Sequence, residues 1–305
     1  MTTVRVALAF GLLAGFATLP LWAEAYYLSF LLFLFISMAL AQSYDLVGGY
    51  MGYLNLGHAA FFGIGAYTFG ILVHEGLPVA VGFAAAVVVP MAFAGGISYP
   101  FFRLRGAYFA LATFGLVVLL ELLAFNFSGL TGGSIGLTVM TGYQLVPAYY
   151  MSLALVAGMA CATILITRSR IGLALVSIRE DEEVAEVFGI HALFFKALTL
   201  MGSAGVAGLA GAVYCWYLTY LIPPTVFGLE TALGPIVMAM LGGSGTVVGP
   251  ILGAFIVDLF REILRLKTQY LALTTYGILL ILVGLFMPGG IARSALWRRL
   301  VARVR

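Results

Sequence analysis

Charged residues are scarce in this chain of 305 residues: they make up 9% of it, against 63% hydrophobic residues. A soluble domain of ordinary composition carries about a quarter charged residues, so this composition excludes a water-soluble globular protein. The two cysteines, Cys161 and Cys215, each lie within an apolar stretch, which excludes a disulfide framework and a cysteine metal cluster. The sequence also lacks a Walker A nucleotide loop and an HExxH zinc motif. We therefore expect no catalytic residues, metal or cofactor in this chain.

Long apolar runs take up most of the sequence. A helix needs ~20 apolar residues to cross a bilayer, and these runs are continuous, whereas barrel strands would alternate. We predict an all-α integral membrane protein with about 8–10 transmembrane helices in one membrane domain over residues 1–305. The predicted spans are 6–23, 27–41, 56–73, 77–102, 106–125, 145–166, 192–217, 232–257 and 271–287.

The first 25 residues are similar to a cleavable signal peptide, with Arg5, an apolar stretch and Ala23-Glu24-Ala25. The apolar stretch is longer than such peptides usually have, and a further span follows from Tyr26. We expect this first helix to be retained.

The positions of lysine and arginine predict the orientation, because cytoplasmic loops carry an excess of them. With the N-terminus inside, the predicted outer loops near 24, 75, 126–144 and 218–230 contain no lysine or arginine. A single crossing by 232–257 would nevertheless place the arginine-rich C-terminal tail outside.

A glycine-rich interruption inside 232–257 resolves this conflict. Gly242, Gly243 and Gly245 weaken a helix and allow the chain to reverse. We predict two short helices, 230–241 and 246–259, which return both termini to the cytoplasm and place twelve of the 15 Lys and Arg residues inside. The earlier stretch 48–58 is also glycine-rich, and either an internal repeat or a chance likeness explains the similarity.

Few polar side chains are candidates for the solute pathway. His58 and Glu121 are the clearest ionisable residues within spans, where a charge is costly and by default indicates a function. The structural alternative is that each pairs with a neighbouring helix. We predict that Asn55 and His58 face a translocation cavity, because they follow the glycine-rich stretch, and that Thr131 and Ser134 lie at its outer mouth.

Ser134 also belongs to a G-x-S-x-G sequence, the pattern of a hydrolase nucleophile elbow. That elbow requires a strand before it and a helix after it. Here the pattern lies in a predicted outer loop between membrane helices, so we do not expect a hydrolase.

The charged loop 168–196 connects two predicted spans. Its Ser-x-x-Glu sequence from Ser177 to Glu180 fits a capping box that starts a helix, and Gly189 fits a C-terminal cap. Acidic residues follow the box, and Val184, Val187 and Phe188 fall on one side of the helix. We predict a short amphipathic cytoplasmic helix, which is either a solvated connector or a helix that docks in a partner's groove.

This loop also carries a family resemblance. Residues 183–189, EVAEVFG, resemble the E-A-A-x-x-x-G coupling motif of ABC-importer permeases, with Val184 at the middle position. Further segments resemble the branched-chain amino-acid permeases, and GHAAFFGIGAY points to the M-type of the two related permeases rather than the H-type. These segments are 56–67, 104–111, 130–134, 169–174, 178–182 and 205–211.

The resemblance implies a permease subunit in a bacterial or archaeal cytoplasmic membrane, not an enzyme. The implied partners are an H-type permease, two cytoplasmic ATPases that hold ATP and Mg²⁺, and a periplasmic or lipid-anchored binding protein. Branched-chain amino acids are the implied solutes, with other amino acids, urea or short amides as alternatives. The residues implied in coupling to the ATPase are Arg179, Glu180, Asp181, Glu183, Ala185, Glu186 and Gly189.

A second hypothesis is a secondary transporter or channel driven by an ion gradient. Such proteins usually place paired charges or unwound ion sites at the middle of the membrane. This chain has scarcely any charge there and does have a coupling-type loop, so the ABC permease is preferred.

Overall fold

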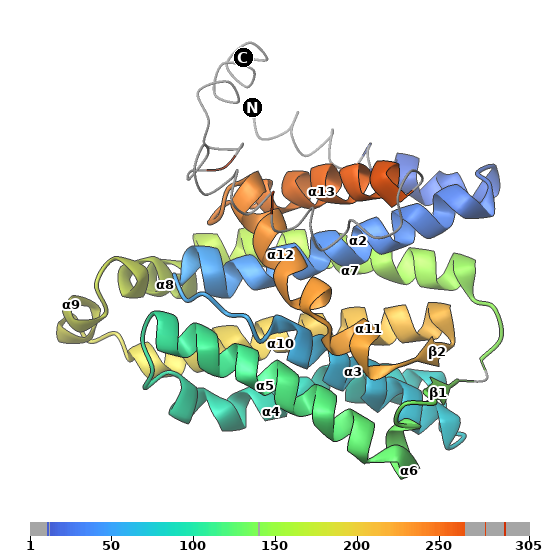
Figure 1. Cartoon of the computed structure of the whole chain (residues 1–305). Helices are drawn as coiled ribbons and strands as arrows, with labels where there is room; N and C mark the ends of the chain where they lie inside the picture. The colour runs from blue at the N-terminus through green and yellow to red at the C-terminus, as the bar shows by residue number, and fades with distance from the viewer. Residues whose placement is uncertain (1–10, 12, 140, 266–277, 279–289, 291–305) are drawn as a thin grey trace.

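Helices make up nearly all of the structure, a computed structural model that describes residues 11, 13–139, 141–265, 278 and 290 (Figure 1). A 3₁₀ turn, η1, comes first, and a π-helical turn, η2, continues α2. The elements in chain order are η1 (Leu19–Leu21), α2 (Ala25–Asp45), η2 (Leu46–Tyr50), α3 (His58–His74), α4 (Val79–Phe101), α5 (Ala107–Asn126), α6 (Ser128–Thr131), β1 (Leu137–Thr138), α7 (Leu145–Arg168), α8 (Arg170–Glu180), α9 (Glu182–Val187), α10 (Ala192–Leu218), β2 (Tyr220–Leu221), α11 (Pro223–Phe227), α12 (Leu229–Gly242) and α13 (Gly249–Arg265).

Six helical segments within the described residues are long and apolar enough to cross a membrane. They are α2 with η2, α4, α5, α7, α10, and α11 with α12, and the shorter apolar helix α3 lies among them. This confirms the all-helical membrane class. The predicted span 271–287, apart from Ile278, and residues 6–10 and 12 of the predicted span 6–23 lie outside the described residues.

Small residues let α10 approach α3 and α4 closely at the centre of the bundle. A Cβ added at Gly208 would collide with the Ala86 carbonyl oxygen, and one at Gly211 would collide with the Phe62 carbonyl oxygen. Only glycine therefore fits these crossings, as expected where helices pack closely in lipid. Gly202, in the same run, has open space beside it and needs no such explanation.

The helix break predicted at 242–245 is present. α12 ends at Gly242, the chain reverses, and α13 packs back against α12. The backbone N–H of Gly245 donates to both carboxylate oxygens of Asp45, at 3.0 and 2.9 Å. A Cβ at Gly49 would collide with that carboxylate and with the Gly245 nitrogen. The two glycine-rich segments therefore meet in space, while their origin in a repeat stays a prediction.

The end of the bundle opposite α9 contains a feature that we did not predict. β1 and β2 form a two-residue antiparallel pair, Leu137 with Leu221 and Thr138 with Tyr220. The pair ties the loop after α5 to the end of α10. The G-x-S-x-G sequence comes after α6 and before β1, so the strand–turn–helix context of a hydrolase elbow is not present there.

Figure 1 shows the resulting shape: long helices run side by side, α8 and α9 protrude at one end, and α6, β1 and β2 lie at the other. We call these the α9 end and the β end.

Candidate coupling surface and membrane cavity

Two consecutive helices form the α9 end, not the single helix that the sequence predicted. Ser177 does not cap a helix; it lies inside α8, and its hydroxyl donates to the Leu173 carbonyl. Ser169 caps α8, and the Asp181 carboxylate caps α9 by accepting from the Val184 N–H at 3.1 Å. The capping-box prediction is wrong because the extended backbone of Asp181 separates the two helices there.

Gly189 ends α9 as predicted. Its φ of +85° is a conformation that glycine adopts without strain, and its N–H donates to the Glu186 carbonyl at 2.9 Å. Nothing lies within 4 Å of where its Cβ would be. The requirement for glycine is therefore one of backbone conformation alone.

The outer side of α9 presents apolar side chains to the surroundings. Val187 and Phe188 are 86% and 81% exposed, and Val184 is about half exposed. Ala185, on the opposite side, is buried. We call Val184, Val187 and Phe188 the α9 apolar edge. Glu180 and Glu186, both exposed, flank it.

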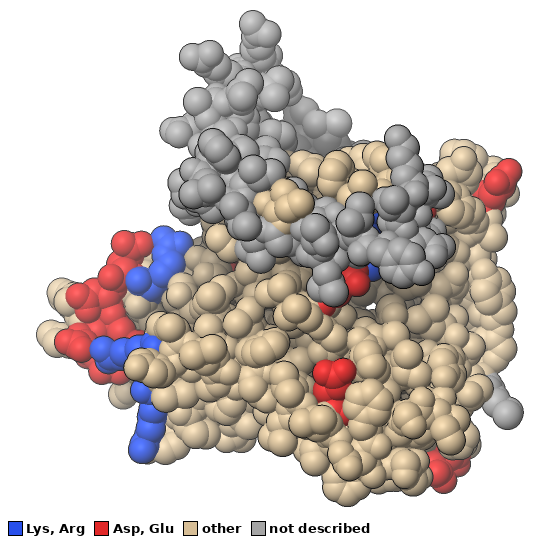
Figure 2. Space-filling model, in the orientation of Figure 1, with Lys and Arg blue, Asp and Glu red and all other residues tan. Residues whose placement is uncertain are grey.

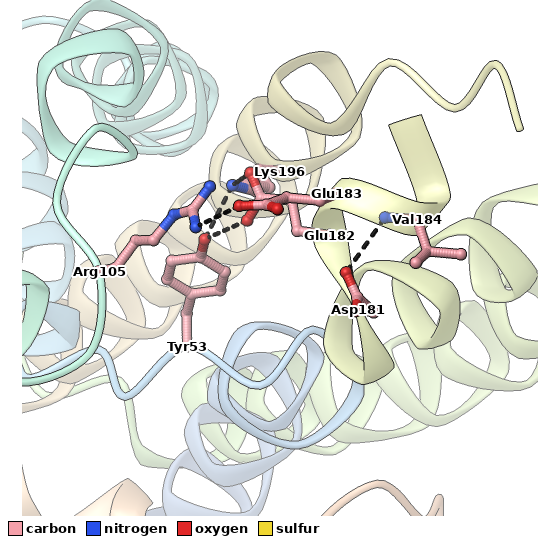
Figure 3. Close-up of polar contacts among 7 residues, drawn as sticks. All are labelled: Tyr53, Arg105, Asp181, Glu182, Glu183, Val184 and Lys196. Carbon is pink, nitrogen blue, oxygen red and sulfur yellow. Dashed lines mark hydrogen bonds and ion pairs between the residues drawn. The ribbon is translucent and has the colours of Figure 1, made fainter. Parts of the chain in front are cut away.

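Behind α9, three side chains from three segments form a tight polar cluster (Figure 3). Lys196 at the start of α10 lies 2.5 Å from Glu182 of α9 and donates to the Tyr53 hydroxyl at 2.8 Å. Tyr53, in the segment before α3, donates to the other Glu182 oxygen at 2.7 Å. The Lys196 side chain is only 2% exposed, and its Nζ also lies 4.8 Å from the Tyr53 ring centroid. The cluster joins α9 to α10 and to the segment before α3.

The charges in this cluster stabilise one another. Burial alone would raise the pKa of Glu182, but the hydrogen bonds from Lys196 and Tyr53 outweigh burial and lower the pKa. Burial first, and then the Glu182 hydrogen bond, raise the pKa of the Tyr53 hydroxyl. Glu182 is thus held ionised and Tyr53 protonated, which keeps the contact between α9 and α10 in place.

More exposed ion pairs surround the cluster. Arg105 pairs with Glu183 at 3.2 Å, and both side chains are mostly exposed. Arg179 pairs with Glu180 at 2.9 Å and donates to the Gly49 carbonyl at 2.9 Å, so it also links α8 to η2. Figure 2 shows that charged side chains gather at this end, whereas apolar and uncharged residues cover most of the visible face between the two ends.

A cavity of about 670 Å³ lies among α2, α3, α10, α11, α12 and α13, toward the β end. Its apolar wall includes Phe30, Phe33, Phe62 and Met238. Four charged side chains also line it: Glu230, Asp258, Arg261 and Glu262. Arg261 is ion-paired with Glu230, and the Tyr26 hydroxyl donates to Glu262 at 2.6 Å.

The structure places none of the five predicted pathway residues in the lining of this cavity. His58 is buried and bonds the Ser43 hydroxyl at 2.9 Å, and the side-chain oxygen of buried Asn55 accepts from the Gly57 N–H. The Thr131 hydroxyl donates to the backbone at the end of α5, while Ser134 is exposed and Glu121 half-buried. A role for them in the pathway stays a prediction.

The chain matches one protein family over most of its length. The sequence profile of the branched-chain amino acid transport system permease component matches residues 26–284. The chain belongs to this family. This match confirms the resemblance that the motifs of the permease indicated.

Individual relatives agree with the family match. The permease is 27% identical over 291 residues to the high-affinity branched-chain amino acid transport system permease protein LivM of Escherichia coli, with 84% of this chain and 67% of LivM covered. It is also 27% identical over 282 residues to LivH of Escherichia coli, covering 83% of this chain and 89% of LivH. BraD of Pseudomonas aeruginosa is 28% identical over 289 residues, covering 83% and 90%. No solved structure matches the chain.

Several residues of the two regions were not predicted from the sequence. Asp45, Lys196 and Asp258 all lie in or beside membrane helices, yet only His58 and Glu121 stood out in the sequence. A signal was available: Asp258, Arg261 and Glu262 are spaced i, i+3, i+4, which places them on one face of a helix. The pairing of Lys196 with Glu182 had no such signal, because it depends on how α9 folds back onto α10.

Proposed function

We propose that the permease is a membrane-spanning subunit of an ABC importer in the cytoplasmic membrane of a bacterium or archaeon, with both termini cytoplasmic. Its partners are a second permease chain of the H-type, two ATPases at the α9 end, and a solute-binding protein at the β end. The exposed α9 apolar edge carries this proposal. An edge of this kind on a capped helix suits a groove in a partner protein.

The sequence contains no nucleotide-binding loop, so energy has to reach the membrane helices through a protein contact. α9 is held to α10 by the Glu182–Lys196 pair and to the segment before α3 by Tyr53. α8 is held to η2 through Arg179 and the Gly49 carbonyl. A displacement of α8 and α9 by an ATPase is thereby passed to α10, α3 and the end of α2.

The helix break offers a second connection. η2 adjoins Asp45, whose carboxylate holds the Gly245 N–H at the turn between α12 and α13. π-Helical turns are frequent at functional positions in helices. Movement at Arg179 is therefore linked, through η2 and Asp45, to the two helices that form one side of the cavity.

Branched-chain amino acids are the proposed solutes, because relatives that cover most of this chain are named for their transport. The chain acts as the M-type partner of the pair, as its 56–67 segment indicates. Urea and short amides are the alternative solutes. ATP and Mg²⁺ reside on the ATPase chains, and this chain carries no enzymatic activity of its own.

The test is purification of the tagged permease in detergent from cells that express all the proposed partners, followed by reconstitution into liposomes. We expect two ATPase chains and a second permease to co-purify, and L-leucine uptake to require both ATP and the binding protein. A membrane-impermeant thiol reagent should reach a Val187→Cys variant from the cytoplasmic face alone.

Other outcomes separate the alternatives. Uptake driven by an ion gradient, with no ATPase in the purified complex, would establish a secondary transporter and overturn the proposal. ATP-dependent uptake of urea that excess L-leucine does not reduce would retain the ABC importer and replace the solute.

A further inference from the structure

The membrane cavity contains a buried carboxylate, Asp258, that the described residues satisfy only in part. The Asp258 side chain is 7% exposed, and among the described residues only the Ser37 hydroxyl is placed to bond it, which leaves most of the acceptor sites of the carboxylate unused. An ionised carboxylate in such surroundings costs several kcal/mol unless a cation or donor satisfies it. Asp258 lines the cavity, so a molecule in the cavity can supply that donor.

The charges around Asp258 favour a solute that carries a positive group. The described lining contains three carboxylates, Glu230, Asp258 and Glu262, and one guanidinium, Arg261. Glu230 and Arg261 neutralise each other as an ion pair. The other two carboxylates, Asp258 and Glu262, attract an ammonium group and repel an anion that has no positively charged group of its own.

Arg261 is placed to receive the other end of a zwitterion. It follows Asp258 by three residues on α13, so both side chains lie on one face of the helix. A guanidinium has five N–H donors in a planar fork whose geometry matches a carboxylate. The facing wall contains Phe30, Phe33 and Met238, which suit an aliphatic side chain. A volume of about 670 Å³ falls within the usual range for small-molecule sites.

We propose that this cavity, built within a single permease chain, binds a zwitterionic α-amino acid, with Asp258 receiving the ammonium group and Arg261 the carboxylate. The proposal rests on the proposed function and deepens it. It makes these two residues determinants of specificity, and it places a solute site between α2, α12 and α13, without a contribution from the second permease chain. A solute that lacks the ammonium group is then excluded by Asp258.

Protection of a single cysteine tests the proposal directly. Thr231, which lines the cavity, is replaced by cysteine in a Cys161→Ser, Cys215→Ala background of the full complex without its binding protein. Labelling with methyl methanethiosulfonate is timed with L-leucine or with 4-methyl-2-oxopentanoate, which has the same carbon skeleton and a ketone in place of the ammonium group. We expect L-leucine to slow labelling severalfold and the keto acid to have no effect.

Substitutions identify the residues responsible. Asp258→Asn should abolish protection by L-leucine, whereas Asp258→Glu should retain part of it. Glu75→Gln removes an exposed acid at the β end outside the cavity and should leave protection unchanged.

Equal protection by the two solutes, or protection that persists in Asp258→Asn, would overturn the proposal. Uptake is measured on the same cysteine variant with the binding protein added back. ATP-driven uptake without any protection would show that this cavity assignment fails while the proposed function holds. Loss of ATPase co-purification would instead count against the proposed function.

Discussion

Charged side chains gather at the α9 end and in the membrane cavity, and their surroundings differ. At the α9 end, Arg105 and Glu183 lie mostly in the open, and only Lys196 is fully buried, against a carboxylate and a hydroxyl. In the cavity, Asp258 is buried with only the Ser37 hydroxyl placed to bond it among the described residues. The first region satisfies its buried charge within the chain, and the second leaves a buried charge only partly satisfied by the described residues.

This difference separates structural charges from binding charges. Exposed ion pairs contribute little to stability, because water and salt screen them. A buried pair is expensive to break, since its partner is left without compensation. We infer that the Lys196–Glu182 pair holds α9 in position, whereas the cavity charges are retained for a solute.

The largest effect is expected from breaking the buried pair. Lys196→Met leaves Glu182 and Tyr53 without the ammonium group, which should cost about 3–5 kcal/mol and abolish uptake. The thermal midpoint of the detergent-purified permease and ATP-driven uptake are the measurements.

Two control variants complete this experiment. Adding Glu182→Leu to Lys196→Met should restore most of the thermal midpoint, because an apolar contact then replaces both charges. Arg105→Met, which breaks an exposed pair, should leave the midpoint unchanged. A drop as large for Arg105→Met as for Lys196→Met would refute the distinction between the two kinds of pair.

A smaller effect is expected from strain at Gly189. A valine there would have to adopt the positive φ of +85°, at about 1–3 kcal/mol, and the turn after α9 would shift. Gly189→Val should therefore reduce uptake strongly and thermal stability modestly. Gly76→Val is the matched control, since Gly76 has a φ of +86° with equally open space and lies after α3, away from α9. Equal loss of uptake in both variants would indicate general destabilisation instead of a coupling defect.

The smallest effect on thermal stability is expected from lowering the pH. The folded pKa of Glu182 lies below its ordinary value of 4.5, so its ion pair contributes fully above that value. This contribution is lost as the pH falls through the lowered pKa. The midpoint of the permease should thus fall more steeply below about pH 4.5 than that of the Lys196→Met, Glu182→Leu variant. Parallel pH profiles would mean that Glu182 does not contribute.

The sequence predicted those features that depend on local backbone chemistry. The run of glycines at 242–245 predicted the reversal, and Gly189 predicted the end of α9, because a glycine signals both without tertiary contacts. The start of α9 was predicted wrongly, since Ser177 and Asp181 both suit an N-cap and only the fold selects between them.

Contacts between distant segments could not be predicted. Tyr53 and Lys196 are 143 positions apart, and Asp45 and Gly245 are 200 apart. No local pattern in the chain states that these pairs meet. The same holds for the cavity, whose walls come from helices at both ends of the described chain.

Replacement of the α9 apolar edge tests most directly whether this edge binds an ATPase. Val187→Ser with Phe188→Ser removes two side chains that are exposed in the permease, so the permease's own thermal midpoint should not change. The number of ATPase chains that co-purify per permease should fall to near zero. Ile135→Ser, which removes an exposed apolar side chain at the β end, should leave that number at two. Full ATPase co-purification with the Val187→Ser, Phe188→Ser variant would show that this edge does not hold the ATPases.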